Sequence, residues 1–106
     1  MKIVAVTSCA TGIAHSYMAA EALKKIAKKN DCQIKVEIQG AMGTENALSS
    51  SDIQNADLII FANDVGITKL ERFANVKEKI YQSAPHDVIK NPDIVFEKAK
   101  KIINIL

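Results

Sequence analysis

The chain has few of the residues from which metal sites, redox pairs and disulfide frameworks are built. Its 106 residues include only two cysteines, Cys9 and Cys32, and two histidines. The cysteine spacing fits neither a zinc site nor a C-x-x-C redox pair, and the scattered carboxylates show no metal-ligand pattern. We therefore expect no metal and no cofactor. Cys32, beside the start of a strand, is expected to be structural.

The sequence also lacks long apolar runs and a strong net charge. No stretch approaches the ~20 apolar residues that span a bilayer, and Met1-Lys2 leads directly into a strand without a signal peptide. The formal net charge of +2 is too small and too dispersed for a nucleic-acid footprint. These absences predict a cytoplasmic protein that neither enters the membrane nor binds nucleic acid.

Two common phosphate-binding motifs are missing as well. The sequence has no G-x-G-x-x-G after its first strand and no G-x-x-x-x-G-K-[ST]. Dinucleotide and P-loop functions therefore lose their usual support.

Hydrophobic periodicity predicts alternating strands and helices in a single domain over residues 1–106. Buried strands are expected at 2–7 and 58–62, a half-exposed strand at 33–39 and a weaker strand at 79–83. Helices are expected at 14–29 and 92–106, with shorter helical segments at 51–55, capped by Ser51, and at 68–73. The segment 40–50 is expected to be a loop, and Pro85-His86 a surface turn.

With right-handed crossovers, these elements predict an α/β three-layer sandwich. Its sheet would have four parallel strands in the order 2-1-3-4, with helices on both faces. In such a sheet the segment after residue 7 and the loop that begins at Asn63-Asp64 both leave the carboxyl edge of the strands. We expect these two loops to lie near each other.

The most informative segment joins the first strand to the first helix, and it reads Cys9-Ala10-Thr11-Gly12-Ile13-Ala14-His15-Ser16. Unpaired amides and the dipole at a helix N-terminus can solvate a phosphoryl group. No proline follows Cys9 before Ser16, so every residue offers an amide, and Gly12 lets the backbone curl around an anion. The same field favours a thiolate nucleophile. A buried, inert cysteine at an ordinary strand–helix junction is the plainer alternative.

This segment, continuing through residues 17–23, strongly resembles the active-site region of fructose-type enzyme IIB domains of the bacterial phosphoenolpyruvate-dependent sugar phosphotransferase system (PTS). The similarity covers nearly the whole chain. It extends through Glu37-Ile38-Gln39-Gly40, Gly43-Thr44-Glu45-Asn46, Asp52-Ile53 with Ala56-Asp57, and Ala62-Asn63-Asp64 with Leu70-Glu71-Arg72-Phe73.

The resemblance implies that Cys9 is a phosphocysteine nucleophile. It would accept a phosphoryl group from a phosphohistidine on enzyme IIA and pass it to a sugar, expected to be fructose, bound by the membrane enzyme IIC. The activity would be that of a protein-Nπ-phosphohistidine–D-fructose phosphotransferase at the inner face of the membrane. The loop would bind phosphate through Ala10, Thr11, Gly12, Ile13, Ala14, His15 and Ser16. The family usually has proline after the cysteine, where this chain has Ala10, and often threonine in place of Ser16.

Two other functions remain open at this point. Low-molecular-weight phosphatases also form a phosphocysteine after the first strand, but they place arginine six positions after the cysteine, where this chain has His15. Arginine grips phosphate through two parallel hydrogen bonds, which imidazole cannot do. A non-catalytic anion-binding module would need the amides but not the sulfur.

Several side chains have alternative roles. Thr11 and Ser16 can contact phosphate or cap the helix, and His15 can bond the phosphate or pack over the strand end. Asp64 is considered as a general acid, but a surface or capping role is preferred. Arg72 is expected at a solvated helix position rather than in support of a partner surface, and His86 is given no role.

Overall fold

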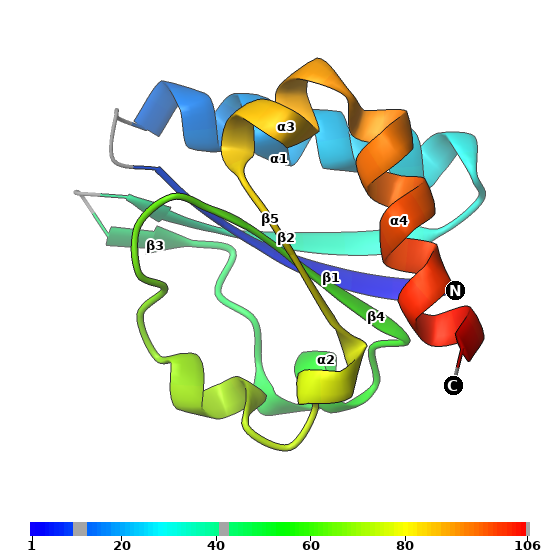
Figure 1. Cartoon of the computed structure of the whole chain (residues 1–106). Coiled ribbons are helices and arrows are strands. Elements are labelled where there is room, and N and C mark those ends of the chain that lie inside the picture. Colours follow the sequence, from blue (N-terminus) through cyan, green and yellow to red (C-terminus); the bar gives the residue numbers. More distant parts are fainter. Residues whose placement is uncertain (10–12, 41–42, 106) are drawn as a thin grey trace.

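The chain forms a mixed five-stranded sheet between two layers of helices (Figure 1). The computed structural model describes residues 1–9, 13–40 and 43–105. The elements in chain order are β1 (Lys2–Ser8), α1 (Ile13–Lys29), β2 (Gln33–Gly40), β3 (Gly43–Glu45), α2 (Ser50–Gln54), β4 (Leu58–Asn63), the 3-10 helices η1 (Leu70–Phe73) and η2 (Lys77–Lys79), β5 (Ile80–Ser83), α3 (Pro85–Lys90) and α4 (Pro92–Ile105).

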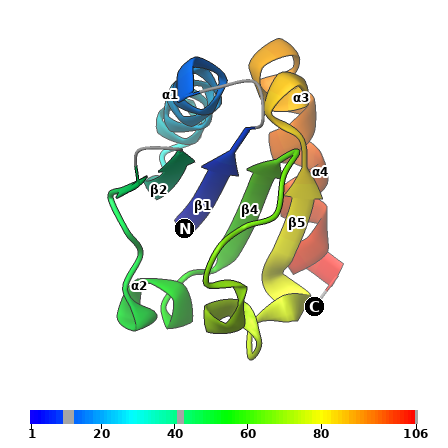
Figure 2. The ribbon, with the colours of Figure 1, turned by 90° about the vertical axis from the view of Figure 1, so that its left-hand side faces the viewer.

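The sheet has the order β3-β2-β1-β4-β5. Figure 2 shows β2, β1, β4 and β5 side by side in this order. The four predicted strands pair in parallel and in the predicted order, so this part of the prediction is confirmed. The prediction of four strands was wrong, because β3 adds a fifth strand that pairs antiparallel with β2. β3 is only three residues long and exposed, so it lacks the alternation that marks a strand in sequence.

Side chains of β1 alternate between the two faces of the sheet and enter two separate cores. Ile3 and Ala5 pack with α1, α3 and α4, which together cover one face. Val4 and Val6 pack under α2 and the 3-10 helices with Ile53, Phe61 and Phe73. This two-faced burial explains the continuous apolar run in β1.

Three local predictions need correction. Pro85 was expected in a surface turn but occupies the first turn of α3, where a missing N–H costs nothing. Ser49 rather than Ser51 caps α2, because Ser49 and Asp52 form a reciprocal capping box. Arg72 was expected to face solvent, but its side chain is only 18% exposed and pairs with buried Glu37.

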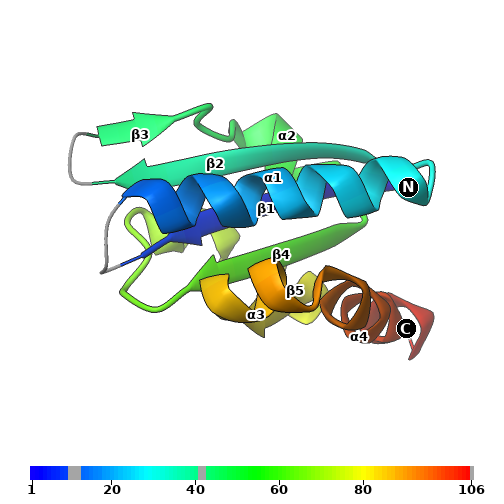
Figure 3. The ribbon, with the colours of Figure 1, turned by 90° about the horizontal axis from the view of Figure 1, so that it is seen from above.

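The carboxyl ends of β1, β2 and β4 point toward the side of the domain where α1 begins (Figure 3). We call this side the carboxyl edge. The start of β1 and the end of α4 lie together at the opposite side (Figure 1). The parallel topology therefore brings the carboxyl ends of separate strands to the side where Cys9 lies, and the start of β1 and the end of α4 lie on the other side.

Candidate functional site

Cys9 lies directly after β1 at the carboxyl edge, as the sequence predicts, and its side chain is partly exposed. Ile13, Ala14, His15 and Ser16 form the first turn of α1. Of the other predicted phosphate-binding residues, Ala10, Thr11 and Gly12 lie outside the described residues. The described geometry places a thiol between the end of a parallel strand and the positive end of a 17-residue helix.

Two titratable side chains lie against the Cys9 sulfur. The thiol donates a hydrogen bond to Asp64 Oδ2 at 3.3 Å, and His15 Nδ1 lies 3.7 Å from the same sulfur. Asp64 comes from the loop after β4, and His15 from α1. The sequence predicted that the Asp64 loop would approach the cysteine. The role preferred for Asp64 from sequence was at the surface or as a helix cap, so this contact was not predicted.

The remaining predicted residues differ in exposure. Ala14 and His15 are exposed, whereas Ser16 is buried and faces the interior from the first turn of α1. Within the described part of the chain, the Ser16 hydroxyl and the hydroxyl of Thr7 have no hydrogen-bond partner. His86 is exposed on α3, and its Nε2 lies 3.3 Å from the Asp87 carboxylate. In the sequence it is far from Cys9.

A buried ion pair supports the loop that carries Asp64. Glu37 on β2 is 1% exposed and accepts hydrogen bonds from both terminal nitrogens of Arg72 at 2.9 Å and from the Leu48 N–H at 2.8 Å. Burial opposes ionisation of Glu37, but the hydrogen bonds from Arg72, Leu48 and Gln39 outweigh it and hold the pKa of Glu37 below its ordinary value. The hydrogen bond to Glu37 in turn raises the pKa of Arg72.

The same cluster reaches the end of the Asp64 loop. Gln39 donates to Glu37 and to the carbonyl of Thr68, and the Thr68 N–H donates to Gln39 Oε1 at 2.9 Å. Arg72 Nε donates to the carbonyl of Lys69 at 2.9 Å. Glu37, Gln39 and Arg72 come from the segments 37–40 and 70–73, which carried the resemblance to IIB domains. Sequence alone gave no sign that the two segments meet.

Another contact joins the first turns of α1 to the edge strand. The hydroxyl of Tyr17 donates a hydrogen bond to the carboxylate of Glu45 on β3. This bond raises the pKa of Tyr17, since removal of the proton would leave two negative charges side by side. The contact links β3, which pairs with β2, to the first turns of α1.

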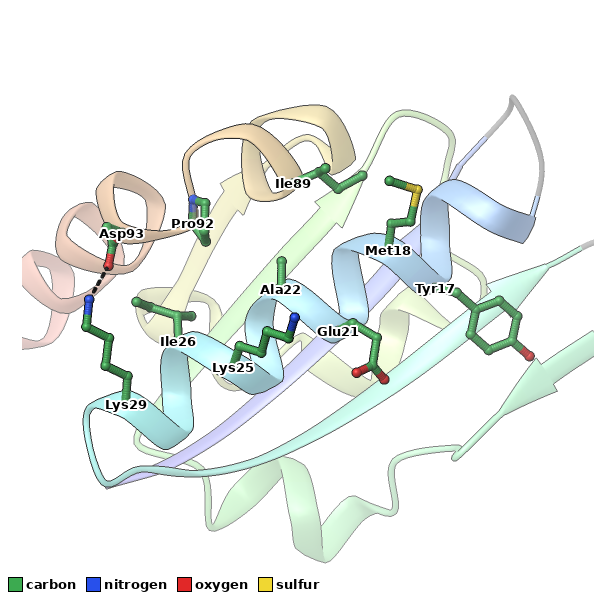
Figure 4. A pocket seen from close by; sticks show the side chains of 10 residues that line it. All are labelled: Tyr17, Met18, Glu21, Ala22, Lys25, Ile26, Lys29, Ile89, Pro92 and Asp93. Atoms are coloured by element: carbon green, nitrogen blue, oxygen red, sulfur yellow. Dashed lines mark ion pairs between the residues drawn. The ribbon is translucent and has the colours of Figure 1, made fainter.

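An apolar groove of about 530 Å³ lies between α1 and the α3–α4 segment (Figure 4). Met18 and Ile89 face each other at one end, and an ion pair of 3.6 Å between Lys29 and Asp93 lies at the other. Neither Cys9, His15 nor Asp64 lines this groove. The groove is therefore separate from the three side chains that meet at the carboxyl edge.

The described residues contain no cluster of three or more metal-ligating side chains. Within the same residues, none of the helices is long and apolar enough to cross a membrane. The groups that could act on a substrate at the carboxyl edge are the sulfur, the carboxylate and the imidazole, together with the amides at the start of α1.

A sequence model of the family described as "PTS system, Lactose/Cellobiose specific IIB subunit" matches residues 4–98. The chain belongs to the IIB family of the PTS. It is 44% identical over 97 residues to "PTS system fructose-like EIIB component 2" of Escherichia coli K12, which covers 92% of this chain and 90% of that protein. The predicted resemblance to IIB domains is confirmed.

Solved structures agree with this assignment. A crystal structure of a predicted fructose-specific IIB from Escherichia coli matches 96% of this chain and 88% of its own, with a TM-score of 0.89 and 35% identity. The "Fructose-like PTS system EIIBC component" of Escherichia coli K12 is 43% identical over 98 residues, and this chain spans only 20% of its length. The arginine phosphatase YwlE shares the fold, with a TM-score of 0.51 at 13% identity, 100% coverage of this chain and 95% of its own.

Proposed function

We propose that this IIB domain, residues 1–106, is a phosphoryl carrier in sugar uptake and that Cys9 holds the phosphoryl group. A phosphohistidine on enzyme IIA would be the donor, and a sugar bound by the membrane enzyme IIC the acceptor. The observation that carries the proposal is the position of the Cys9 sulfur. It lies at the carboxyl edge, just before α1, with Asp64 Oδ2 at 3.3 Å and His15 Nδ1 at 3.7 Å.

The transfer needs a nucleophile and a set of donors for the phosphoryl oxygens. Cys9 attacks phosphorus in line with the leaving imidazole nitrogen, while charge spreads over three equatorial oxygens. The backbone amides from Ala10 to Ser16, at the positive end of α1, are the proposed donors for these oxygens. The side chains of Thr11 and Ser16 are proposed to contact the phosphoryl group or to cap the helix.

The partner side of the proposal rests on exposure and on the relatives. Three exposed apolar side chains, Tyr17, Met18 and Val65, belong to the segments that adjoin Cys9, and they supply contact area for a docking protein. One relative's name joins B and C components, which supports a IIC partner and work at the inner face of the membrane. Fructose or a closely related sugar is the proposed substrate, following the names of the fructose-like relatives.

Phosphorylation followed by phosphorus NMR tests this function. The protein is incubated with phosphoenolpyruvate, the general phosphotransferase proteins and a fructose-type IIA, and the label is then located. We expect a phosphorothioate resonance that disappears in Cys9→Ala and persists in the matched control Cys32→Ala. A label on His15 or His86, or undiminished labelling of Cys9→Ala, would overturn the proposal.

An aryl phosphate assay separates the carrier from a phosphatase. The position six residues after Cys9 holds His15, which provides no two-pronged guanidinium clamp for a phosphate ester. We therefore expect no sustained turnover of p-nitrophenyl phosphate. Turnover comparable to that of a cysteine phosphatase would replace the carrier function with hydrolysis.

A further inference from the structure

Asp64 lies where it can exchange a proton with the reactive sulfur. Its Oδ2 accepts a hydrogen bond from the Cys9 thiol at 3.3 Å, and its side chain is exposed. A carboxylate at hydrogen-bond distance from a nucleophile is the arrangement expected of a general base. The family assignment and the fold give no role to this residue, so its contact with the sulfur requires an explanation.

The backbone fixes Asp64 in this place. Its N–H donates to the carbonyl of Ser8 at 3.1 Å, which ties it to the residue before Cys9. Ser8 and Asn63 are partners in the parallel register of β1 and β4. Asn63 is held in turn, because its amide donates to the Val65 carbonyl at 2.7 Å and accepts from Gln82 at 2.6 Å. The contact between Cys9 and Asp64 therefore follows from strand pairing.

Phosphorylation of Cys9 changes the charge beside this carboxylate. A phosphoryl group brings about −1.5 to −2 charges at neutral pH. If Asp64 stayed ionised, a third negative charge would lie next to the phosphoryl oxygens, and like charges at this distance disfavour ionisation. A carboxyl group that gains a proton as the phosphoryl group arrives avoids this repulsion and becomes a hydrogen-bond donor.

We propose that Asp64 is a catalytic residue that takes the Cys9 thiol proton during phosphorylation and returns it when the phosphoryl group leaves; this rests on the carrier function proposed above. In the first half, the S–H bond breaks and the proton moves to Asp64 Oδ2 while the sulfur lone pair forms the S–P bond. The P–N bond breaks with its electron pair on the donor imidazole, which is protonated on its other nitrogen and leaves neutral.

The second half reverses the proton movement. The S–P bond breaks with its electron pair on sulfur, and the Asp64 carboxyl group protonates the sulfur. The accepting hydroxyl forms the new O–P bond and loses its proton to solvent. The carrier then regains a thiol and a carboxylate, ready for another cycle.

Among the described residues, His15 also lies against the sulfur, but at a longer distance than Asp64. Its Nδ1 lies 3.7 Å from Sγ, compared with 3.3 Å for Asp64 Oδ2. The shorter distance favours Asp64 as the acceptor of the thiol proton.

The test compares Asp64→Asn with the wild-type protein and with Asp31→Asn. Asp31 has φ 56°, a conformation that asparagine adopts readily, and it lies in the turn after α1, away from the carboxyl edge. The control therefore removes the same charge elsewhere. The phosphoryl donors in this test are N-phosphoimidazole and a phosphorylated fructose-type IIA. We expect phosphorylation of Asp64→Asn to be slower by about 10²- to 10³-fold, with Asp31→Asn at the wild-type rate.

Alkylation separates proton transfer from a loss of structure. Asparagine has nearly the same shape as aspartate, so the partly exposed sulfur should stay accessible to a small reagent. Cys9 of Asp64→Asn should therefore still be alkylated to completion by iodoacetamide, while its phosphorylation is slower. Loss of alkylation, or phosphorylation at the wild-type rate, would overturn the role of Asp64.

A measurement on the wild-type protein needs no variant. The ¹³C resonance of the Asp64 carboxyl group at pH 7 should report the ionised form before phosphorylation and the protonated form afterwards. An ionised carboxylate in the phosphoprotein would overturn the inference. If neither donor phosphorylates the wild-type protein, the carrier function itself fails; if both do but Asp64→Asn is unaffected, only the inference fails.

Discussion

Two carboxylates near the carboxyl edge have opposite surroundings. Glu37 is buried and accepts hydrogen bonds from Arg72, Leu48 and Gln39. Asp64 is exposed and accepts from the Cys9 thiol. A buried carboxylate surrounded by donors is held in its ionised form and fixes neighbouring segments. An exposed carboxylate beside a nucleophile can gain and lose a proton without unfolding the domain.

The two are also physically connected. The Glu37 cluster holds Thr68 and Lys69 through Gln39 and Arg72, and these residues end the loop that begins with Asp64. At its other end the loop is tied to Ser8. Glu37 therefore has a structural role and Asp64 the catalytic role that we propose, and substitutions that separate the two properties can test this contrast.

Arg72→Met should give the largest loss of stability. The substitution leaves Glu37 buried without its cationic partner, and breaking such a pair by removing one member typically costs about 3 kcal/mol or more. Urea denaturation followed by circular dichroism measures the change. Lys24→Met, which removes an exposed ion pair with Glu21 on α1, is the control and should cost less than about 1 kcal/mol. Equal losses in the two variants would contradict a structural role for the buried pair.

The pH dependence of stability should reveal Glu37 as well. Its pKa lies below the ordinary value of 4.5 in the folded chain, so the folded state binds fewer protons than the unfolded state. The stability that it contributes is complete above the unfolded value and is lost as the pH falls through the lower folded value. In Glu37→Gln, the free energy of unfolding should therefore decrease less steeply below about pH 4.5. An unchanged slope in urea titrations would argue against this assignment.

Asp64→Asn should have the smallest effect on stability. The side chain is exposed, and substitutions at such positions usually change the free energy of unfolding by no more than about 0.5 kcal/mol. The same urea titration measures it beside Arg72→Met. A loss as large as that of Arg72→Met would make Asp64 a structural residue and remove the contrast between the two acids.

Much of the fold was predictable because it is recorded in local patterns. The continuous apolar runs of β1 and β4, the alternation in β2 and the stripe of α1 predicted three strands and the first helix. The weaker pattern of β5 added a fourth strand, and right-handed crossovers gave the order. β3 and α3 escaped prediction for local reasons. β3 has three exposed residues and no periodicity, and the proline that begins α3 resembles a helix breaker unless its position in the first turn is known.

The candidate site was predictable in outline but not in detail. A cysteine after the first strand and a second loop at the same edge followed from the parallel topology. The contact between Cys9 and Asp64 depends on the register of β1 with β4, which brings together residues 55 positions apart. The burial of Arg72 depends likewise on Glu37, 35 positions away. Such contacts join residues far apart in the sequence, so composition and periodicity do not predict them.

The placement of the two chain ends has a further consequence. β1 begins and α4 ends on the side of the domain remote from Cys9 (Figure 1). A tether attached at either end would therefore join the domain on the side opposite Cys9 and leave the carboxyl edge uncovered. In the carrier function proposed above, a domain held in this way could rotate between a donor and an acceptor and present the Cys9 sulfur to each in turn.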